Sequence, residues 1–537
     1  MIFHEQQLRT LPATHPAPLL CCKIAKRQQE IISKRETFRV KHWASNSRCA
    51  LPIIVLGGFG GISVFGIIRR QELSEPLEKK MSSTTHLSRR QFAQLGTIGL
   101  TLPLSGLPKR ANTPSLEKLR TAHVGVGGMG RADLNSVSSH EMVEVAALCD
   151  VDSNTLQQAG SKHPGAKQFR DFREMISELG DSIDAVVVST PDHTHAPAAM
   201  TAMLAGKPVY CQKPLTHDAF ESRQLRIVAN ERKLVTQMGV QIHSAAPYKR
   251  AVRMIQDGVV GKVSQVHAWS NKNWGYDGKP YQGEQDPPEH LEWNLWLGTA
   301  PRRSFVPRVF HPGNWRKLID FGTGTLGDMG VHIFDTPYTA LKLTAPNWIK
   351  TTCRKPTGFG HPEKNIVEYE FPGTQYTTET MIWKWYDGKF APPKIEEVGL
   401  KSENPETKLP GQGSLFIGEK GQLLLPHIGE PILFPESQFK DYKRPDVVSE
   451  DHYHQWVDAC FGKKRTSMSF DLAGPLTESL LLGVVANRFP EQKLLWDTTA
   501  MKVKNVAEAN ALIRRDYRQG FEVERLTESA SATSSLP

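Results

Sequence analysis

Cysteine is scarce in this chain, and its spacing excludes both a disulfide framework and a cysteine-based metal site. None of the seven cysteines in the 537 residues forms a Cys-x-x-Cys pair. They are Cys21, Cys22, Cys49, Cys149, Cys211, Cys353 and Cys460. Disulfide scaffolds and zinc sites need denser and more regular cysteines. We therefore expect no metal, and we expect the cysteines of the body to be small buried side chains.

Net charge is lacking outside the N-terminal part. The chain carries +10, but residues 1–120 hold 19 Lys+Arg and 7 Asp+Glu, so residues 121–537 have a balance of −2. A near-neutral body gives no electrostatic reason to expect nucleic acid as a partner. The hydrophobic content of 39% and the charged content of 23% are typical of a globular protein. The length indicates more than one domain.

The N-terminal part contains two apolar runs. Residues 49–68, CALPIIVLGGFGGISVFGII, have the length of a membrane span but are rich in glycine. Residues 95–107 form the second run, which follows Met81 and the stretch SRRQF at 88–92. That arrangement resembles a twin-arginine export signal.

An export signal belongs at an N-terminus, so we expect translation to start at Met81. Residues 1–80 would then be an extension that is not made or has no fixed structure; a membrane span at 49–68 is the alternative. Residues 81–112 would be read by the twin-arginine export machinery. No clean Ala-x-Ala follows the apolar run, so the signal could persist as an anchor. We expect a periplasmic or periplasm-facing anchored protein, or a cytoplasmic one if the signal is not used.

A glycine-rich turn indicates a dinucleotide site. Gly125, Gly127 and Gly130 form Gly-x-Gly-x-x-Gly between an apolar strand and a helix-like stretch. The three glycines allow a tight turn, a close approach of the pyrophosphate and close packing of helix on strand. Gly128 and Met129 lie in the same turn, where the N–H groups of a helix N-terminus face the phosphates.

Asp150 ends the second apolar strand, twenty residues after Gly130. A carboxylate at this place accepts hydrogen bonds from the ribose hydroxyls and repels a 2′-phosphate. The sequence therefore favours NAD over NADP as the cofactor.

Strand-like and helix-like segments alternate along residues 119–240, which predicts a doubly wound parallel sheet. We expect an α/β fold with a Rossmann domain at 113–245. A second domain at 246–523 would contain half-buried strands such as KVSQVHAWSN and NIVEYEF. Residues 524–537 have the composition of a disordered tail.

Polar residues follow several of these strands. Thr190, Pro191 and His195 follow the fourth strand, Lys213 the fifth and Gln241 the sixth. Ligands bind at the carboxyl ends of parallel strands, so we expect these residues to line the cofactor cleft. For His195, capping of its helix is the alternative to a contact with the nicotinamide.

The stretch TGTLGDMGVHIFDTPY, residues 323–338, places Asp328, His332 and Asp335 four and three residues apart. If the segment is helical, the three side chains share one face. Ionisable groups on an apolar segment indicate a functional site. A surface helix with a polar stripe is the alternative.

Several motifs occur in an order that resembles the glucose–fructose oxidoreductase / inositol dehydrogenase / MocA family over about residues 119–523. They are VGVGGMG, STPDHTH, GKPVYCQKPLT, WNLWLGTAPRR, GDMGVHIFD and GPLTESLLLGVVANRF. The resemblance implies a Rossmann domain and an α/β domain with a largely antiparallel open sheet. It also implies a homo-oligomer that uses NAD to oxidise or reduce a secondary alcohol of a sugar or cyclitol. The family's Glu-Lys-Pro motif falls on Gln212-Lys213-Pro214, so the glutamate is replaced here.

The family's Asp-x-x-x-His pair falls on Asp328 and His332. We expect His332 to be the base, because the pKa of histidine lies near neutrality. Asp328 would hold the substrate, and Lys213 would steady the developing alkoxide and share its proton. Asp335 would either support the residues that touch the substrate or be a structural partner. Trp315 and Arg316 suit sugar recognition, although ordinary interface packing explains them equally well.

Two other functions fit the same residues. A glycoside hydrolase or lyase could oxidise its substrate transiently with tightly held NAD, and export would favour such a retained cofactor. A non-enzymatic nucleotide sensor is disfavoured, because the chain keeps Lys213, Asp328 and His332.

Overall fold

The computed structural model describes residues 117–527. The expected start at Met81, the signal-like residues 81–112 and the apolar run 49–68 all lie outside this range. Within 117–527, no helix is long and apolar enough to cross a membrane. Cys149 and Cys211 are buried and free, as expected, and Cys353 and Cys460 are half-buried and free.

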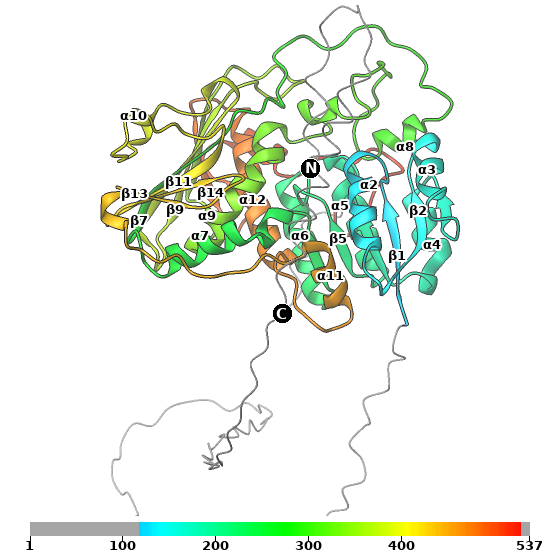
Figure 1. Cartoon of the computed structure of the whole chain (residues 1–537). Coiled ribbons are helices and arrows are strands. Elements are labelled where there is room, and N and C mark those ends of the chain that lie inside the picture. Colours follow the sequence, from blue (N-terminus) through cyan, green and yellow to red (C-terminus); the bar gives the residue numbers. More distant parts are fainter. Residues whose placement is uncertain (1–116, 528–537) are drawn as a thin grey trace, which may run out of the picture. The chain divides into compact units, whose positions relative to one another are not determined.

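Residues 119–238 contain a six-stranded parallel sheet in the order β3-β2-β1-β4-β5-β6 (Figure 1). The strands are β1 (Leu119–Val124), β2 (Val143–Cys149), β3 (Lys167–Phe169), β4 (Ala185–Val188), β5 (Val209–Cys211) and β6 (Thr236–Met238). The connecting helices are α2 (Gly128–Ser138), α3 (Ser153–Gly160), α4 (Phe172–Leu179), α5 (Asp192–Leu204) and α6 (Ala219–Glu231). The predicted alternation is confirmed, and every residue of the apolar β4 is buried, as expected for a central parallel strand.

The second sheet has nine strands in the order β13-β12-β11-β7-β10-β9-β8-β14-β15. They are β7 (Val263–Ser270), β8 (Trp348–Thr352), β9 (Ile366–Pro372), β10 (Thr377–Asp387), β11 (Gln412–Gly418), β12 (Gln422–Pro426), β13 (Ile432–Phe434), β14 (Lys493–Asp497) and β15 (Lys502–Val503). All pairings are antiparallel except that of β7 with β10. The predicted α/β architecture with a largely antiparallel second sheet is therefore confirmed.

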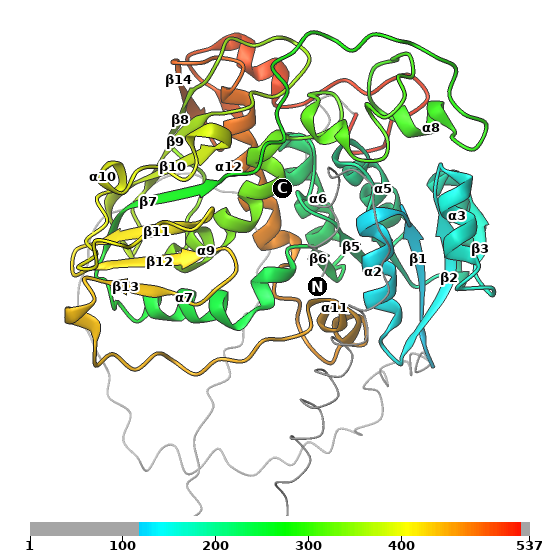
Figure 2. The same ribbon diagram turned by 45° about the horizontal axis from the view of Figure 1, so that its top comes forward.

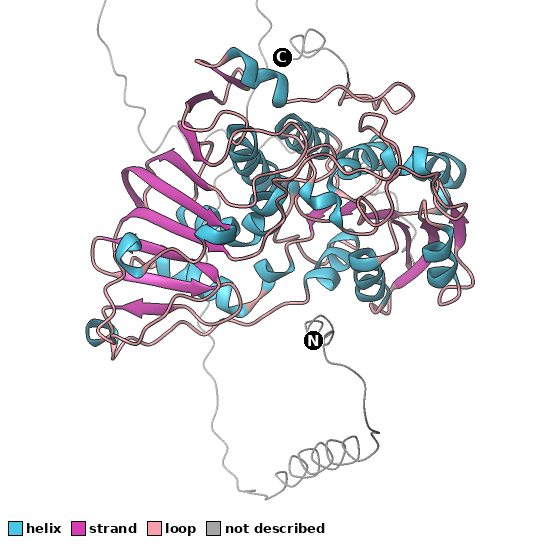
Figure 3. Cartoon of the chain, turned by 90° about the horizontal axis from the view of Figure 1, so that it is seen from above, coloured by secondary structure: helices cyan, strands magenta, loops and turns pink. Residues whose placement is uncertain are grey.

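Helices α6, α9 (Val331–Leu341) and α12 (Phe470–Ala486) lie between the two sheets (Figures 2 and 3). The other helices of this part are α7 (Ala246–Gln256), α8 (Trp293–Leu297), α10 (Ile395–Val398) and α11 (His452–Cys460). Helix α12 packs on α6 of the first domain and on β8 and β9 of the second sheet. These contacts explain why its sequence is apolar on nearly all sides.

Candidate active site

The glycine-rich turn joins β1 to α2 and leaves open space beside the start of the helix. Gly125 has φ +81°, and a Cβ there would lie 2.7 Å from the Ser189 carbonyl oxygen. A Cβ on Gly130 would lie 2.0 Å from the Gly125 carbonyl oxygen, so only glycine fits. A Cβ on Gly128 would meet nothing within 4 Å. The turn therefore fits a pyrophosphate held by helix N–H groups, and Met129 is 43% exposed in the same turn.

Asp150 is held at the end of β2 by backbone hydrogen bonds. Its Oδ2 accepts from the Val126 N–H at 2.9 Å, and its Oδ1 accepts from the Asp152 N–H at 2.9 Å. Burial raises the pKa of this carboxyl group. Each oxygen retains a lone pair, so the carboxylate can also accept from ribose hydroxyls.

His195 bridges two loops of the parallel sheet instead of presenting a free ring nitrogen. Its Nδ1 lies 2.7 Å from the Pro214 carbonyl oxygen, and its Nε2 lies 2.8 Å from the Thr190 carbonyl oxygen. The ring thus ties the segment after β4 to the segment after β5. Pro191 is the N-cap residue of α5. His195 therefore has no free ring nitrogen with which to contact a nicotinamide.

Gln241 belongs to a buried polar network around Asp133, which the sequence analysis missed. Gln241 donates to the Tyr453 hydroxyl at 2.9 Å, and Tyr453 donates to Asp133 Oδ1 at 2.8 Å. Gln212 donates to the same oxygen at 3.0 Å, and the Ser189 hydroxyl donates to Asp133 Oδ2 at 2.6 Å. Burial raises the pKa of Asp133. A carboxylate inside the nucleotide-binding helix was the one available sequence signal for this network.

Lys213 and Arg316 converge on Asp328. The Lys213 ammonium donates to Asp328 Oδ1 at 3.0 Å and to the Asp328 carbonyl oxygen at 3.0 Å. Arg316 Nε donates to the same Oδ1 at 3.2 Å. Burial opposes ionisation of Asp328, but the two cations outweigh it and lower its pKa to about 2. Within the described residues Oδ2 has no hydrogen-bond partner and is not fully buried, so it can accept from a ligand.

His332 lies one turn after Asp328, where a π-helical turn (Leu326–Gly330) leads into α9. Its Nδ1 is buried without a hydrogen-bond partner, whereas Nε2 is unpartnered among residues 117–527 but not fully buried. Burial, followed by the charge of Lys213, lowers the pKa of His332 well below its ordinary value. The imidazole is therefore neutral at neutral pH, and the near-neutral pKa that we expected for His332 does not hold in this site. Its Nε2 is open beside Lys213 and Asp328.

Asp335 does not join this group. It is fully buried and forms an ion pair with His243, with Nδ1 and Oδ2 2.8 Å apart. Thr339 also donates to its Oδ1 at 3.1 Å. Asp335 is thus a structural partner, as one of the two expectations had it. The three residues expected on one helix face thus do not form one group. Asp328 and His332 lie near Lys213, whereas Asp335 pairs with His243.

Glycines near Asp328 serve packing within the protein. A Cβ on Gly322 would lie 2.6 Å from Arg316 Cα, and a Cβ on Gly327 would lie 1.9 Å from Thr323 Oγ1. These spaces are filled by the chain itself, so they provide no approach for a ligand.

Trp315 is a core residue that supports Arg316. It is 6% exposed and belongs to an apolar cluster that contains Trp296 and Phe321. The Arg316 guanidinium lies 4.2 Å from its ring centre. Of the two residues expected at the substrate, only Arg316 reaches the Lys213–Asp328 pair.

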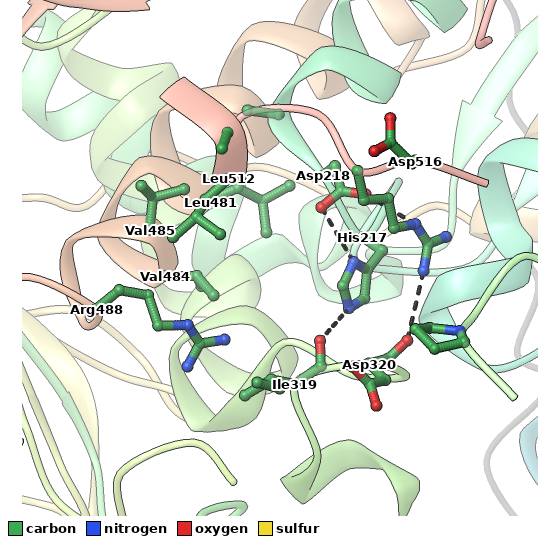
Figure 4. Close-up of a pocket in the computed structure, with 14 residues that line it drawn as sticks. His217, Asp218, Ile319, Asp320, Leu481, Val484, Val485, Arg488, Leu512 and Asp516 are labelled. Atoms are coloured by element: carbon green, nitrogen blue, oxygen red, sulfur yellow. Dashed lines mark hydrogen bonds and ion pairs between the residues drawn. The ribbon is translucent and has the colours of Figure 1, made fainter. Parts of the chain in front are cut away.

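A separate cavity of about 350 Å³ lies between α6 and α12 (Figure 4). Apolar residues of α12, among them Leu481 and Val484, face His217 across it. Both ring nitrogens of His217 are engaged, Nδ1 with Asp218 at 3.2 Å and Nε2 with the Ile319 carbonyl oxygen at 3.1 Å. The residues that line this cavity include none of the Lys213, Asp328 and His332 cluster.

Comparisons with known proteins match the two domains of this fold. A profile of the oxidoreductase family with an NAD-binding Rossmann fold covers residues 119–240, and that of the family's C-terminal alpha/beta domain covers 245–346. An inositol 2-dehydrogenase of Corynebacterium glutamicum (strain R) is 30% identical over 151 residues, which are 27% of this chain and 44% of the relative. The rhizopine catabolism protein MocA of Rhizobium meliloti is 26% identical over 221 residues, 41% of this chain and 56% of the relative.

The chain thus spans about half the length of the curated relatives that it matches. Among solved structures, the WlbA dehydrogenase from Bordetella pertussis, in complex with NADH and UDP-GlcNAcA, has a TM-score of 0.50. It is 14% identical, and the match covers 71% of this chain and 99% of that one, so it supports the fold alone. The chain is therefore similar to the glucose–fructose oxidoreductase / inositol dehydrogenase / MocA family over residues 119–346, with an NAD-binding Rossmann domain at residues 119–240.

Proposed function

We propose that this protein is an NAD-dependent oxidoreductase that acts on a secondary alcohol of a sugar or cyclitol. The observation that carries the proposal is the open Nε2 of a neutral His332 beside the Lys213–Asp328 pair. Lys213 stands at the carboxyl end of β5, where ligands of parallel sheets bind. The inositol 2-dehydrogenase among the relatives supports the substrate class.

Each side chain of the cluster has a separate part in alcohol oxidation. NAD held by the glycine-rich turn and Asp150 would supply a hydride acceptor for the alcohol carbon. His332 Nε2 takes the hydroxyl proton, and the oxygen forms the new carbonyl double bond. Lys213 donates a hydrogen bond to this oxygen as negative charge develops on it. Asp328 holds the Lys213 ammonium in place and offers Oδ2 to the substrate.

The test is formation of NADH with myo-inositol and a panel of aldoses and polyols. We expect the His332→Asn variant to lose roughly 10²-fold or more in turnover, because a general base contributes about that much. Its affinity for NAD should be unchanged, because His332 lies on α9 and not in the nucleotide turn. Turnover that survives in this variant would refute the assignment of the base.

We also propose that residues 81–112 direct twin-arginine export of a folded, cofactor-loaded enzyme, which works as a homo-oligomer. The SRRQF stretch and the apolar run after it support export. Protein purified without added cofactor is denatured, and the supernatant is assayed for NAD(H). Near-stoichiometric NAD(H) would support export of a loaded enzyme and the hydrolase or lyase alternative. Empty protein that binds added NAD would favour a plain dehydrogenase.

A further inference from the structure

A second histidine, His427, stands beside His332 and has no part in the mechanism above. It follows β12 directly, so it comes from the second sheet, whereas His332 comes from α9. The two ring centres are 5.4 Å apart. His427 is half-buried, and no sequence motif drew attention to it.

Tyr248 on α7 fixes the orientation of His427. Its buried hydroxyl lies 3.1 Å from the His332 carbonyl oxygen and 3.0 Å from His427 Nδ1. A carbonyl oxygen can only accept a hydrogen bond, so the single hydroxyl proton goes to His332 O. The hydroxyl oxygen then accepts from His427 Nδ1–H. This arrangement leaves the lone pair of His427 on Nε2.

Nε2 of His427 is available to a ligand. Among residues 117–527 it has no hydrogen-bond partner, and it is not fully buried. Burial, followed by the charge of Lys213, lowers the pKa of His427 to about 4. Nε2 of His332 is a second acceptor in the Nδ1–H tautomer that the proposed base requires. The site then offers two neutral imidazole acceptors side by side, and two acceptors are best satisfied by two hydroxyl donors.

We propose that His427 is a second hydroxyl acceptor of the active site and that the substrate carries two hydroxyl groups on adjacent carbons. One hydroxyl binds His332 and is oxidised, while its neighbour donates to His427 Nε2. Adjacent hydroxyls of one ring can reach both imidazoles, because the imidazole centres are only 5.4 Å apart. This inference rests on the proposed oxidoreductase function and adds the vicinal diol as the substrate feature that the site prefers.

The first test needs no turnover. In the full chain labelled with ¹⁵N-histidine, we expect His427 to show a protonated Nδ1 and an unprotonated Nε2 at neutral pH. Addition of cyclohexane-1,2-diol should shift the Nε2 signals of His332 and His427, whereas cyclohexanol should shift only that of His332. A protonated Nε2 on His427 would overturn the proposal. So would a His427 signal that the diol leaves unchanged.

A matched pair elsewhere in the fold provides the control. His267 Nδ1 lies 3.0 Å from the Tyr386 hydroxyl, and burial likewise lowers the pKa of His267 to about 4. This pair bridges β7 and β10 within the second sheet. Neither alcohol should shift the His267 signal, and Tyr386→Phe should leave the diol response of His427 intact. Tyr248→Phe should abolish the fixed tautomer of His427.

Turnover separates the two proposals. His427→Phe should reduce kcat/KM on an oxidised diol at least 10-fold and bring it towards the value for the corresponding mono-alcohol, whereas Tyr386→Phe should leave both values at the wild-type level. If His332→Asn is inactive but His427→Phe keeps the preference for the diol, the role of His427 fails and the oxidoreductase stands. If His332→Asn keeps full turnover, the proposed function itself fails.

Discussion

Lys213 reaches from the parallel-sheet domain to Asp328 of the second domain, donating at 3.0 Å both to its carboxylate and to its main-chain carbonyl. The two residues are 115 positions apart in the chain. Both side chains are largely buried, at 16% and 11% exposed. The pair therefore holds the two domains together at the place where the cofactor domain meets the candidate base His332.

We expect Asp328→Asn to lower both stability and turnover. The variant keeps the shape of the side chain but leaves Lys213 and Arg316 without a partner charge, and breaking a buried pair costs about 3 kcal/mol. Asp320→Asn is the matched control, because Asp320 pairs with Arg303 outside the cluster. Urea unfolding should show a loss in both variants, while only Asp328→Asn should lose turnover on the accepted alcohol. Equal turnover in the two variants would contradict a role for Asp328 at the substrate.

Asp150 should determine both the affinity for NAD and the discrimination against NADP. Asp150→Ala removes the ribose acceptor and the hydrogen bonds from Val126 and Asp152, so we expect the Kd for NAD to rise about 10-fold or more. Asp150→Asn removes the charge but keeps one acceptor oxygen for a backbone N–H. Comparison of the two variants therefore separates the effect of the charge from that of the lost backbone hydrogen bonds. Fluorescence titration with NADH and NADPH measures both effects. An unchanged NADH affinity in Asp150→Ala would exclude the ribose contact.

Periodicity predicted the parallel sheet well, because its strands and helices follow one another along the chain and each carries its own apolar pattern. The contacts of the site depend on long-range packing instead. Neither the pairing of Asp335 with His243 nor the burial of Trp315 leaves a local signal. His427 follows an ordinary apolar strand and is brought to His332 only by the arrangement of the second sheet.

The replacement of the family's glutamate by Gln212 fits the presence of Asp133. Gln212 donates to Asp133 at 3.0 Å and accepts from the Lys213 N–H at 3.1 Å. The side chain therefore uses both its NH2 group and its carbonyl oxygen. Gln212→Glu would oppose two buried carboxyl groups, one of which would have to remain protonated.

We expect Gln212→Glu to cost roughly 1 to 3 kcal/mol of unfolding free energy at pH 7 and less at pH 5. In the double variant Asp133→Asn with Gln212→Glu, the amide at position 133 can again donate to a carboxylate, now at position 212. It should therefore be more stable than the sum of the two single changes predicts. Additive losses in urea unfolding would show that the two side chains do not depend on each other.

The stability of the folded protein should fall on mild acidification, because several histidines are buried in the neutral form. Burial lowers the pKa of His123 and His193 to about 3 and that of His452 to about 4. The unfolded chain takes up protons at these groups below pH 6.5, whereas the folded chain does not. Their contribution is thus complete above pH 6.5 and is lost as the pH falls towards 4.

One histidine acts in the opposite direction. Asp335 outweighs burial and raises the pKa of His243, so that its contribution is present at low pH and is lost as the pH rises through the raised value. The contribution of Asp328 to stability is lost only below pH 3.8, because its pKa in the folded protein is about 2. Buried carboxyl groups with a raised pKa, such as Asp387 at about 7, act in the same direction as His243. The buried neutral histidines outnumber these groups, so urea midpoints should still decrease from pH 7 to pH 4.5. His267→Gln should make this decrease shallower, and an unchanged slope in this variant would contradict a contribution from the neutral histidine.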